Sequence, residues 1–176
     1  FNLEENHGFA VIEAGTNHFG EIDYLANILK PDIAVITNIG PTHIEFLENI
    51  EGVAKEKGSL FKHLKQTGKA ILNNETRCVE YLKNIAGKRL ITYGLTSGTV
   101  TSTKVTVKEN SSIVEVEGHP LEIPFKGDHY VSNFLAAVTV ARSLGFSWEE
   151  IAKGSKNIKT VHGRLDLLLD DPIHLI

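Results

Sequence analysis

Two side chains that can bind a metal or transfer a proton each follow a predicted strand. Glu13 comes directly after the apolar residues 9–12, and His43 follows the apolar residues 33–37 across a turn that contains Gly40 and Pro41. Because ligands of open α/β sheets bind at the carboxyl ends of the strands, we expect Glu13 and His43 to meet there. A carboxylate and an imidazole could together hold a divalent cation or act as acid and base. The alternative is that both are exposed loop residues.

A lysine is predicted on an apolar helix face. The spacing of Val53, Leu60, Phe61 and Leu64 predicts a helix over residues 51–65, and Lys57 falls on the same face. A buried ammonium is costly unless it has a partner, so Lys57 either finds one or extends its charged end to the surface. The spacing alone favours the surface alternative.

The elements that would position these residues form an α/β pattern. Strands are predicted at 9–12, 33–37, 70–72 and 90–93, and helices at 20–30, 51–65, 75–86 and 128–144. This alternation is typical of a mostly parallel sheet with right-handed crossovers, flanked by helices.

The chain changes character between residues 99 and 125. Val and Ile alternate there with polar residues between turn signals, which predicts a small antiparallel sub-sheet with one wet face. Downstream, Ser147 and Glu150 form a capping box that opens a short helix ending at Lys156.

Composition excludes several classes of protein. The chain has 176 residues, 41% of them hydrophobic and 23% charged, as expected for one soluble domain or most of one. A net charge of −4 gives no sign of a nucleic-acid surface, and no apolar run has membrane-spanning length. Cys78 is the only cysteine, which fits a reducing cytoplasm. The chain begins at Phe1 and has no methionine, so we interpret it as a fragment of a longer protein.

Two common catalytic motifs are absent from the sequence. It contains no Gly-x-x-x-x-Gly-Lys-Ser/Thr phosphate loop and no Gly-x-Ser-x-Gly nucleophile elbow. A serine-hydrolase triad therefore has no support.

Three stretches resemble the central ATPase domain of the Mur ligases. They are EAGTNHFGEI at residues 13–22, TNIGPTHIE at 37–45 and DHYVSNFLAA at 128–137. They occur in the order found in the family, and the similarity extends over residues 9–164. Within the family, the first two stretches are most similar to the members that join D-alanyl-D-alanine to UDP-N-acetylmuramoyl-tripeptide. The resemblance implies a fold like that of the phosphate-loop NTPases.

The resemblance also implies a metal site. Glu13 and His43 match the family's Mg²⁺ ligands, and Lys57 matches a lysine that the family carries as a carbamate. Carbamylation would convert the inward-facing cation into an anion that can face the metal. His43 and Lys57 are accordingly the implied catalytic residues.

The same resemblance implies a nucleotide site. Asn133 matches an asparagine that contacts adenine, and His129 opens that motif, in which Tyr130 stands where the family usually has asparagine. Arg164 matches an arginine that approaches the nucleotide, and Asn38 would line the site.

The implied reaction is ATP-dependent amide-bond formation in peptidoglycan precursor synthesis. A substrate carboxylate attacks the γ-phosphate of ATP to form an acyl phosphate, and the amine of D-alanyl-D-alanine then displaces phosphate. Mg²⁺ neutralises the charge on the phosphates. The resemblance implies a cytoplasmic, monomeric enzyme with no nucleic-acid or membrane partner.

On this interpretation residues 1–176 are part of a central ATP-binding domain with an antiparallel insertion at about 99–125. The phosphate loop and a nucleotide-sugar domain would lie upstream and a carboxyl-terminal domain downstream, so the isolated chain is expected to be inactive. Two alternatives stay open. One is another ligase of the superfamily, such as a folylpolyglutamate synthase or a murein peptide recycling ligase, and the other is a non-catalytic nucleotide-binding module. The flanking sequences would distinguish them.

Overall fold

The computed structural model describes residues 4–159, which form two compact units divided between Thr92 and Tyr93. Six strands follow one another in the sheet in chain order. The pairs β1–β2 and β3–β4 are parallel, and the pairs β4–β5 and β5–β6 are antiparallel. Six α-helices accompany the strands in the described part of the chain. The predicted fold, an α/β sheet with an antiparallel sub-sheet, is therefore confirmed.

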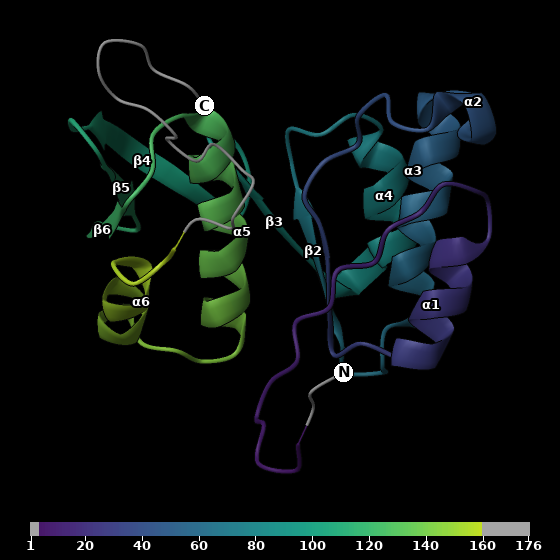
Figure 1. Ribbon diagram of the computed structural model, residues 1–176, viewed down its shortest axis with the longest axis horizontal. Coiled ribbons are helices and arrows are strands. Elements are labelled where there is room, and N and C mark those ends of the chain that lie inside the picture. Colours follow the sequence, from purple (N-terminus) through teal and green to yellow (C-terminus); the bar gives the residue numbers. More distant parts are fainter. Residues whose placement is uncertain (1–3, 160–176) are drawn as a thin grey trace, which may run out of the picture. The chain divides into compact units, whose positions relative to one another are not determined.

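The first unit is built from two parallel strands and a layer of helices (Figure 1). The strands are β1 (Ile33–Ile36) and β2 (Lys69–Asn73), with Ile33 opposite Lys69. The helices are α1 (Glu21–Leu29), α2 (Ile44–Leu47), α3 (Ile50–Gly58) and α4 (Val79–Ala86). Helix α3 contacts both α1 and α4, and α4 contacts β2.

The core of this unit is made by apolar residues of its strands and helical segments. Ile36 and Leu72 from the strands pack in one buried cluster with Val53, Phe61 and Leu82 from the helical segments. Burial of such side chains is worth about 1.5–3 kcal/mol each, which fixes α3 and α4 against the strands.

Two predicted helices have different bounds in the structure. The helix predicted over 51–65 changes after Gly58 into a 3-10 helix, Ser59–His63. The helix predicted over 75–86 begins only at Val79. The cause of the late start is a turn: Asn73 Oδ1 accepts the Glu75 N–H over 2.9 Å, and such a side chain–backbone bond competes with a helical start.

The strand predicted at residues 9–12 is wrong. No strand of residues 4–159 includes this segment, which runs as an irregular tube into α1 (Figure 1). Phe9 is 65% exposed and Val11 fully exposed. A short apolar run becomes a strand only when a neighbouring strand supplies a ladder and a surface to cover it, and here neither is recorded among the described residues.

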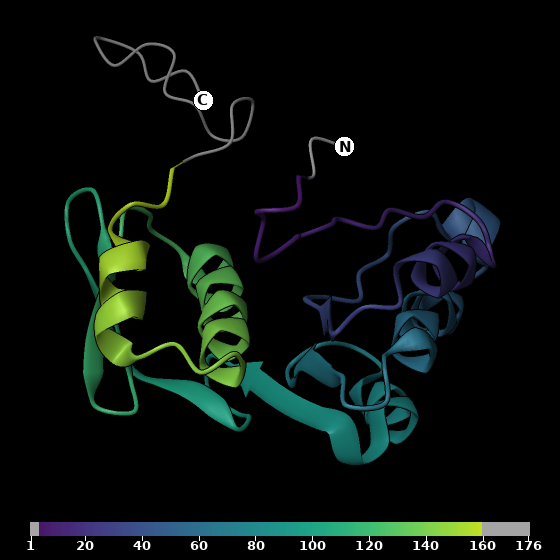
Figure 2. The same ribbon diagram turned by 90° about the horizontal axis from the view of Figure 1, so that it is seen from below.

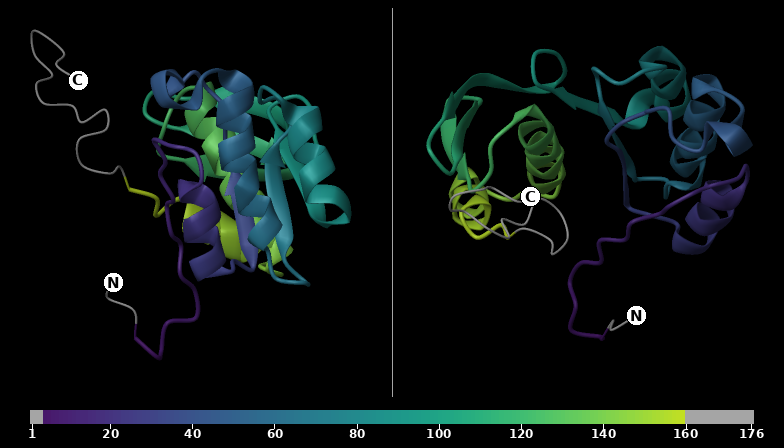
Figure 3. Two further views of the ribbon diagram at one scale, coloured as in Figure 1. Left: turned by 90° about the vertical axis from the view of Figure 1, so that its right-hand side faces the viewer. Right: turned by 45° about the horizontal axis from the view of Figure 1, so that its top comes forward.

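The second unit places two helices against an antiparallel sheet (Figure 2). Its strands are β4 (Val100–Val107), β5 (Ser112–Val116) and β6 (His119–Ile123), and its helices are α5 (Asp128–Ser143) and α6 (Trp148–Ser155). Strand β3 (Leu90–Gly94) joins β4 in parallel through Tyr93 and Val100. Helix α5 contacts β4 and α6 contacts β6, as Figure 3 lets the reader follow.

The antiparallel sub-sheet and the capping box predicted for this unit are confirmed, although Val105 and Val107 of β4 are 38% and 62% exposed. Val114, Val116, Leu121 and Ile123 are buried, as the alternation required. The capping box is formed: Ser147 Oγ accepts the Glu150 N–H, and Glu150 Oε2 accepts the Ser147 N–H over 2.7 Å. No helix of residues 4–159 is long and apolar enough to cross a membrane.

Candidate functional site

The loop that follows β1 receives the side chain of Lys57. Lys57 Nζ donates a hydrogen bond to the main-chain oxygen of Asn38 over 3.2 Å. Lys57 is half-buried on α3, whereas its neighbour Lys55 is exposed. Burial lowers the pKa of Lys57 below its ordinary value of 10.5, because desolvation disfavours the ammonium. The lysine that spacing placed on the apolar helix face is thus half-buried with a main-chain partner at the carboxyl end of β1, although spacing alone favoured extension of its charged end to the surface.

Asn73, the last residue of β2, and Thr76, three residues later, fix the position of this loop. Thr76 Oγ1 accepts the Ile39 N–H over 2.6 Å and donates to Asn38 Oδ1 over 3.1 Å. Asn73 Nδ2 donates to the Thr37 oxygen over 3.0 Å. Both anchoring side chains are buried, so water competes little for these bonds. Asn38 therefore presents its main-chain oxygen to Lys57, while its side-chain oxygen is engaged by Thr76.

Sequence reasoning missed both anchors. The signal available was a polar residue, Asn73, directly after the apolar stretch of β2. Which loop Asn73 and Thr76 would contact depends on the parallel pairing of β1 with β2.

His43 is held in an uncommon backbone conformation. It begins helix α2 with φ 55° and ψ 33°, the left-handed region, and it is exposed. For a residue with a Cβ this region costs roughly 1–2 kcal/mol, and such strain gathers at functional sites. Lys30, Glu48, Cys78 and Glu117 also have a positive φ, so this conformation by itself does not single out His43 as a functional residue.

Glu13 lies in the irregular segment before α1 and is exposed. Within residues 4–159 no three His, Cys, Asp or Glu side chains are grouped as a metal would require. The meeting of Glu13 with His43 remains a prediction. Mg²⁺ usually keeps several waters and phosphate oxygens as ligands, so a protein site for it needs only one or two carboxylates such as that of Glu13.

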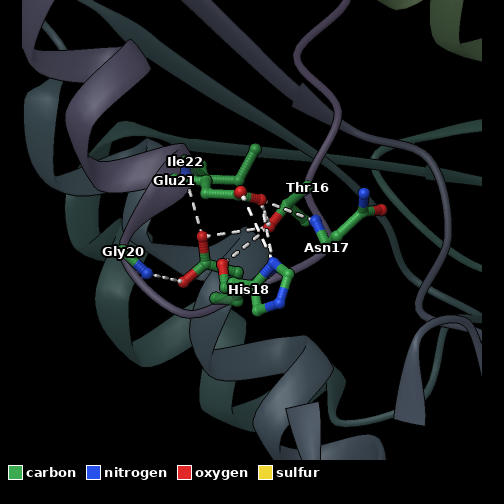
Figure 4. Close-up of polar contacts among 7 residues, drawn as sticks. Thr16, Asn17, His18, Gly20, Glu21 and Ile22 are labelled. Carbon is green, nitrogen blue, oxygen red and sulfur yellow. Dashed lines mark hydrogen bonds and ion pairs between the residues drawn. The ribbon is translucent and has the colours of Figure 1, made fainter. Parts of the chain in front are cut away.

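The stretch that begins with Glu13 is shaped by a carboxylate (Figure 4). Glu21 Oε2 accepts the N–H groups of Asn17 and His18 over 2.6 and 3.0 Å and the hydroxyl of Thr16 over 3.1 Å. The Asn17 N–H, followed by that of His18, lowers the pKa of Glu21 to about 2. The glutamate at the end of this motif therefore folds the loop back on α1.

Two of the residues predicted to contact nucleotide, His129 and Asn133, lie on α5. His129 and Asn133 are four residues apart near the start of the helix, so they share a face, and both are exposed. Tyr130 stacks on Phe125 with ring centroids 4.7 Å apart, which explains what an aromatic residue does at that position of the motif. Arg164 lies outside the described residues.

A surface cavity of about 390 Å³ is lined in part by residues of α3. Lys55, and not Lys57, lines it, together with Phe19, Gly52, Cys78 and Tyr81 among others. The Lys55 ammonium lies 5.8 Å from the centre of the Phe19 ring, so this lysine has a surface role distinct from that of Lys57.

Comparison with known proteins identifies the family. The sequence profile of the Mur ligase middle domain matches residues 1–141. The chain is 32% identical to UDP-N-acetylmuramoyl-tripeptide–D-alanyl-D-alanine ligase of Escherichia coli over 96% of its own length and 41% of the relative's.

Solved structures of Mur ligases support the same family. A crystal structure of MurF from Acinetobacter baumannii is 30% identical, with a TM-score of 0.91 over 98% of this chain and 39% of that one. MurF from Thermotoga maritima in complex with ADP shares the fold, with a TM-score of 0.74 at 23% identity. The chain thus spans about two fifths of the relatives it matches. From its profile match and these likenesses, the chain belongs to the Mur ligase middle domain family.

Proposed function

We propose that this chain is the central part of an ATP-dependent ligase that joins D-alanyl-D-alanine to UDP-N-acetylmuramoyl-tripeptide. Family membership supports an ATP-dependent ligase, and the relatives near 30% identity that carry this activity in their names support the choice of substrates. The structural observation behind the proposal is the bond of Lys57 to the Asn38 oxygen, because it brings the lysine to the strand end where the site is expected.

In the proposed site Lys57 reacts with carbon dioxide. The uncharged amine forms a bond to the carbon of CO₂ and loses one proton to solvent, which leaves a carbamate anion. Burial of the side chain supports this step, because it favours the uncharged amine. Mg²⁺, when bound, would neutralise charge on the transferring phosphoryl group. Glu13 and His43 would hold the metal, and the Lys57 carbamate would position it.

Two of the proposed nucleotide contacts come from α5. Asn133 and His129 offer an amide and an imidazole from one exposed face of α5. Arg164 and Asn38 complete the proposed set. Residues 1–176 alone would carry out no turnover, since the proposal places the phosphate loop and the two substrate domains in the rest of the protein. We further propose that the enzyme acts in the cytoplasm as a monomer.

The test is a reaction with the full-length protein. ATP, Mg²⁺, UDP-N-acetylmuramoyl-tripeptide and D-alanyl-D-alanine are mixed, and phosphate release and the mass of the product are measured. The proposal predicts phosphate release that requires both substrates and a product heavier by the dipeptide less one water. Turnover with a folate and glutamate instead would assign the chain to a sister ligase, and nucleotide binding without turnover would assign it to a non-catalytic module.

A further inference from the structure

The carboxylate of Glu56, on α3, is bonded to the main chain at the end of the stretch 13–22. Glu56 is only 3% exposed, and its two oxygens accept main-chain N–H groups at the start of α1. The Gly20 N–H donates to Oε2 over 2.8 Å, and the Ile22 N–H donates to Oε1 over 2.7 Å. The Thr16 hydroxyl lies 3.3 Å from Oε1. The glutamate therefore caps a helix that Gly20, at its N-cap, cannot cap by itself.

This arrangement is unusual for a buried charge. None of the ion pairs recorded for residues 4–159 includes Glu56. The charge is instead compensated by the N-terminal N–H groups of α1, where the helix dipole favours an anion. Glu56 therefore links α3 to the start of α1, and removal of its carboxylate would leave the N–H groups of Gly20 and Ile22 without this acceptor.

Glu56 directly precedes Lys57 in the chain, which relates its hydrogen bonds to the candidate site. Its neighbour Lys57 donates to Asn38, so adjacent residues of α3 are bonded to two motif stretches. Glu56 contacts Thr16, Gly20 and Ile22 of the first stretch, and Lys57 contacts Asn38 of the second. A shift of one stretch relative to the other would therefore have to break a bond at α3.

We propose that Glu56 is a positioning residue, which holds the loop from Thr16 to Gly20, and with it Glu13, in a fixed place relative to Lys57. This inference rests on the proposed function in that Glu13 and Lys57 serve one metal site. Glu56 itself touches neither substrate nor metal. It acts through the main chain of the loop.

The test is the change Glu56→Gln in the full-length protein. Glutamine has nearly the same shape, but one of its two acceptor atoms becomes an NH₂ group, which would face the N–H of Gly20 or Ile22. The matched control is Glu51→Gln, the same change at an exposed position of the same helix. Three quantities are measured for each protein: kcat for amide formation, the Mg²⁺ concentration at half-maximal rate, and the binding of Mg²⁺ with a non-hydrolysable ATP analogue by calorimetry.

For Glu56→Gln we expect kcat to fall and the Mg²⁺ requirement to rise, each by about 10- to 100-fold, the usual range when a residue supporting a metal ligand is changed. The calorimetric affinity should weaken in parallel, and Glu51→Gln should stay near wild type. A purely structural role would lower the melting temperature and leave the Mg²⁺ requirement of the folded fraction unchanged. That result would overturn the proposal.

Two further outcomes have a defined interpretation: a Glu56→Gln protein that does not fold, and a wild-type protein without ligase activity. If Glu56→Gln does not fold, Glu56→Asp, which keeps the carboxylate on a shorter side chain, takes its place, and an unchanged Mg²⁺ requirement there would overturn the proposal. If the wild-type protein forms no amide bond, the proposed function fails. The calorimetric comparison then decides the role of Glu56 by itself, and equal affinities would refute it.

Discussion

The amine of Lys57 lies 3.2 Å from the main-chain oxygen of Asn38, so α3 and the loop after β1 are joined by a lysine. A carbonyl oxygen is a weak partner for an ammonium that is half removed from water. The lysine is therefore poised to lose its proton more easily than a surface lysine does.

The first prediction is that the amine of Lys57, in folded protein whose lysine carries no carbamate, titrates below its ordinary value of 10.5. Because the unfolded chain then binds more protons between the folded and the unfolded pKa, stability should rise with pH through that window. The measurement is an NMR titration of lysine side chains, in which Lys57→Gln identifies the signal. A Lys57 resonance that titrates at or above 10.5 would contradict the account.

The second prediction concerns the low pKa of Glu21. Its carboxylate should titrate near pH 2, because the N–H groups of Asn17 and His18 stabilise the anion. A depressed carboxyl pKa stabilises the fold above the unfolded value of 4.5, and this contribution is lost as pH falls toward 2. Glu21→Gln should thus be less stable than wild type at pH 7, by a margin that shrinks on acidification. Denaturant unfolding at several pH values measures the margin, and one that is constant from pH 7 to pH 2 would refute the assignment.

The third prediction is that alanine has opposite effects on stability at two helical glycines, Gly52 and Gly154. A Cβ at Gly52 of α3 would collide with the main-chain oxygen of Leu47, whereas a Cβ at Gly154 of α6 would meet nothing within 4 Å. Gly52→Ala should therefore destabilise the fold by about 1–3 kcal/mol, the usual cost of overpacking. Gly154→Ala should stabilise it by roughly 0.5–1 kcal/mol, the helix preference of alanine. Urea unfolding of both variants measures these changes, and a Gly52→Ala protein as stable as wild type or more stable would show the close approach of α2 and α3 to be wrong.

The fourth prediction uses the strained backbone of His43. Glycine adopts the left-handed conformation without strain, so His43→Gly should keep or raise stability, by up to about 1 kcal/mol, while it removes the imidazole. Lys30→Gly is the matched control, because Lys30 also has a positive φ, of 43°, at the end of α1. Only His43→Gly should lower kcat and weaken the Mg²⁺ dependence of the full-length enzyme. If neither variant alters the Mg²⁺ titration, His43 is not a metal ligand.

Local patterns predicted the elements whose stabilising groups are close in sequence. The capping box of Ser147 and Glu150 is complete within four residues, and β1 is a short apolar run bounded by Pro31 and Gly40. The start of α4 was misplaced because Asn73 closes a turn that competes with the helix. Residues 9–12 failed as a strand because their apolar side chains are not covered by a partner strand among the described residues.

The site was predictable to a smaller extent. Spacing placed Lys57 on the inner face of its helix, but its bond to Asn38 joins residues 19 apart and depends on the tertiary fold. Glu56 escaped notice although it lies three residues after Val53 and four before Leu60, the same spacing that singled out Lys57. Glu13 and His43 were candidates from their positions after predicted strands, and family resemblance added their match to Mg²⁺ ligands. The roles of His129, Asn133 and Arg164 came from resemblance alone, and all five roles remain predictions.

The most direct test of the account is Lys57→Ala in the full-length enzyme, with and without a short carboxylic acid such as acetate. We predict a folded protein with almost no amide-forming activity, whose turnover returns in part as the acid occupies the space of the lost side chain and restores an anion. Lys55→Ala, at the exposed neighbouring position that faces Phe19, should keep near wild-type turnover. Wild-type turnover in Lys57→Ala, or a loss that Lys55→Ala shares and no acid restores, would contradict the central role of Lys57.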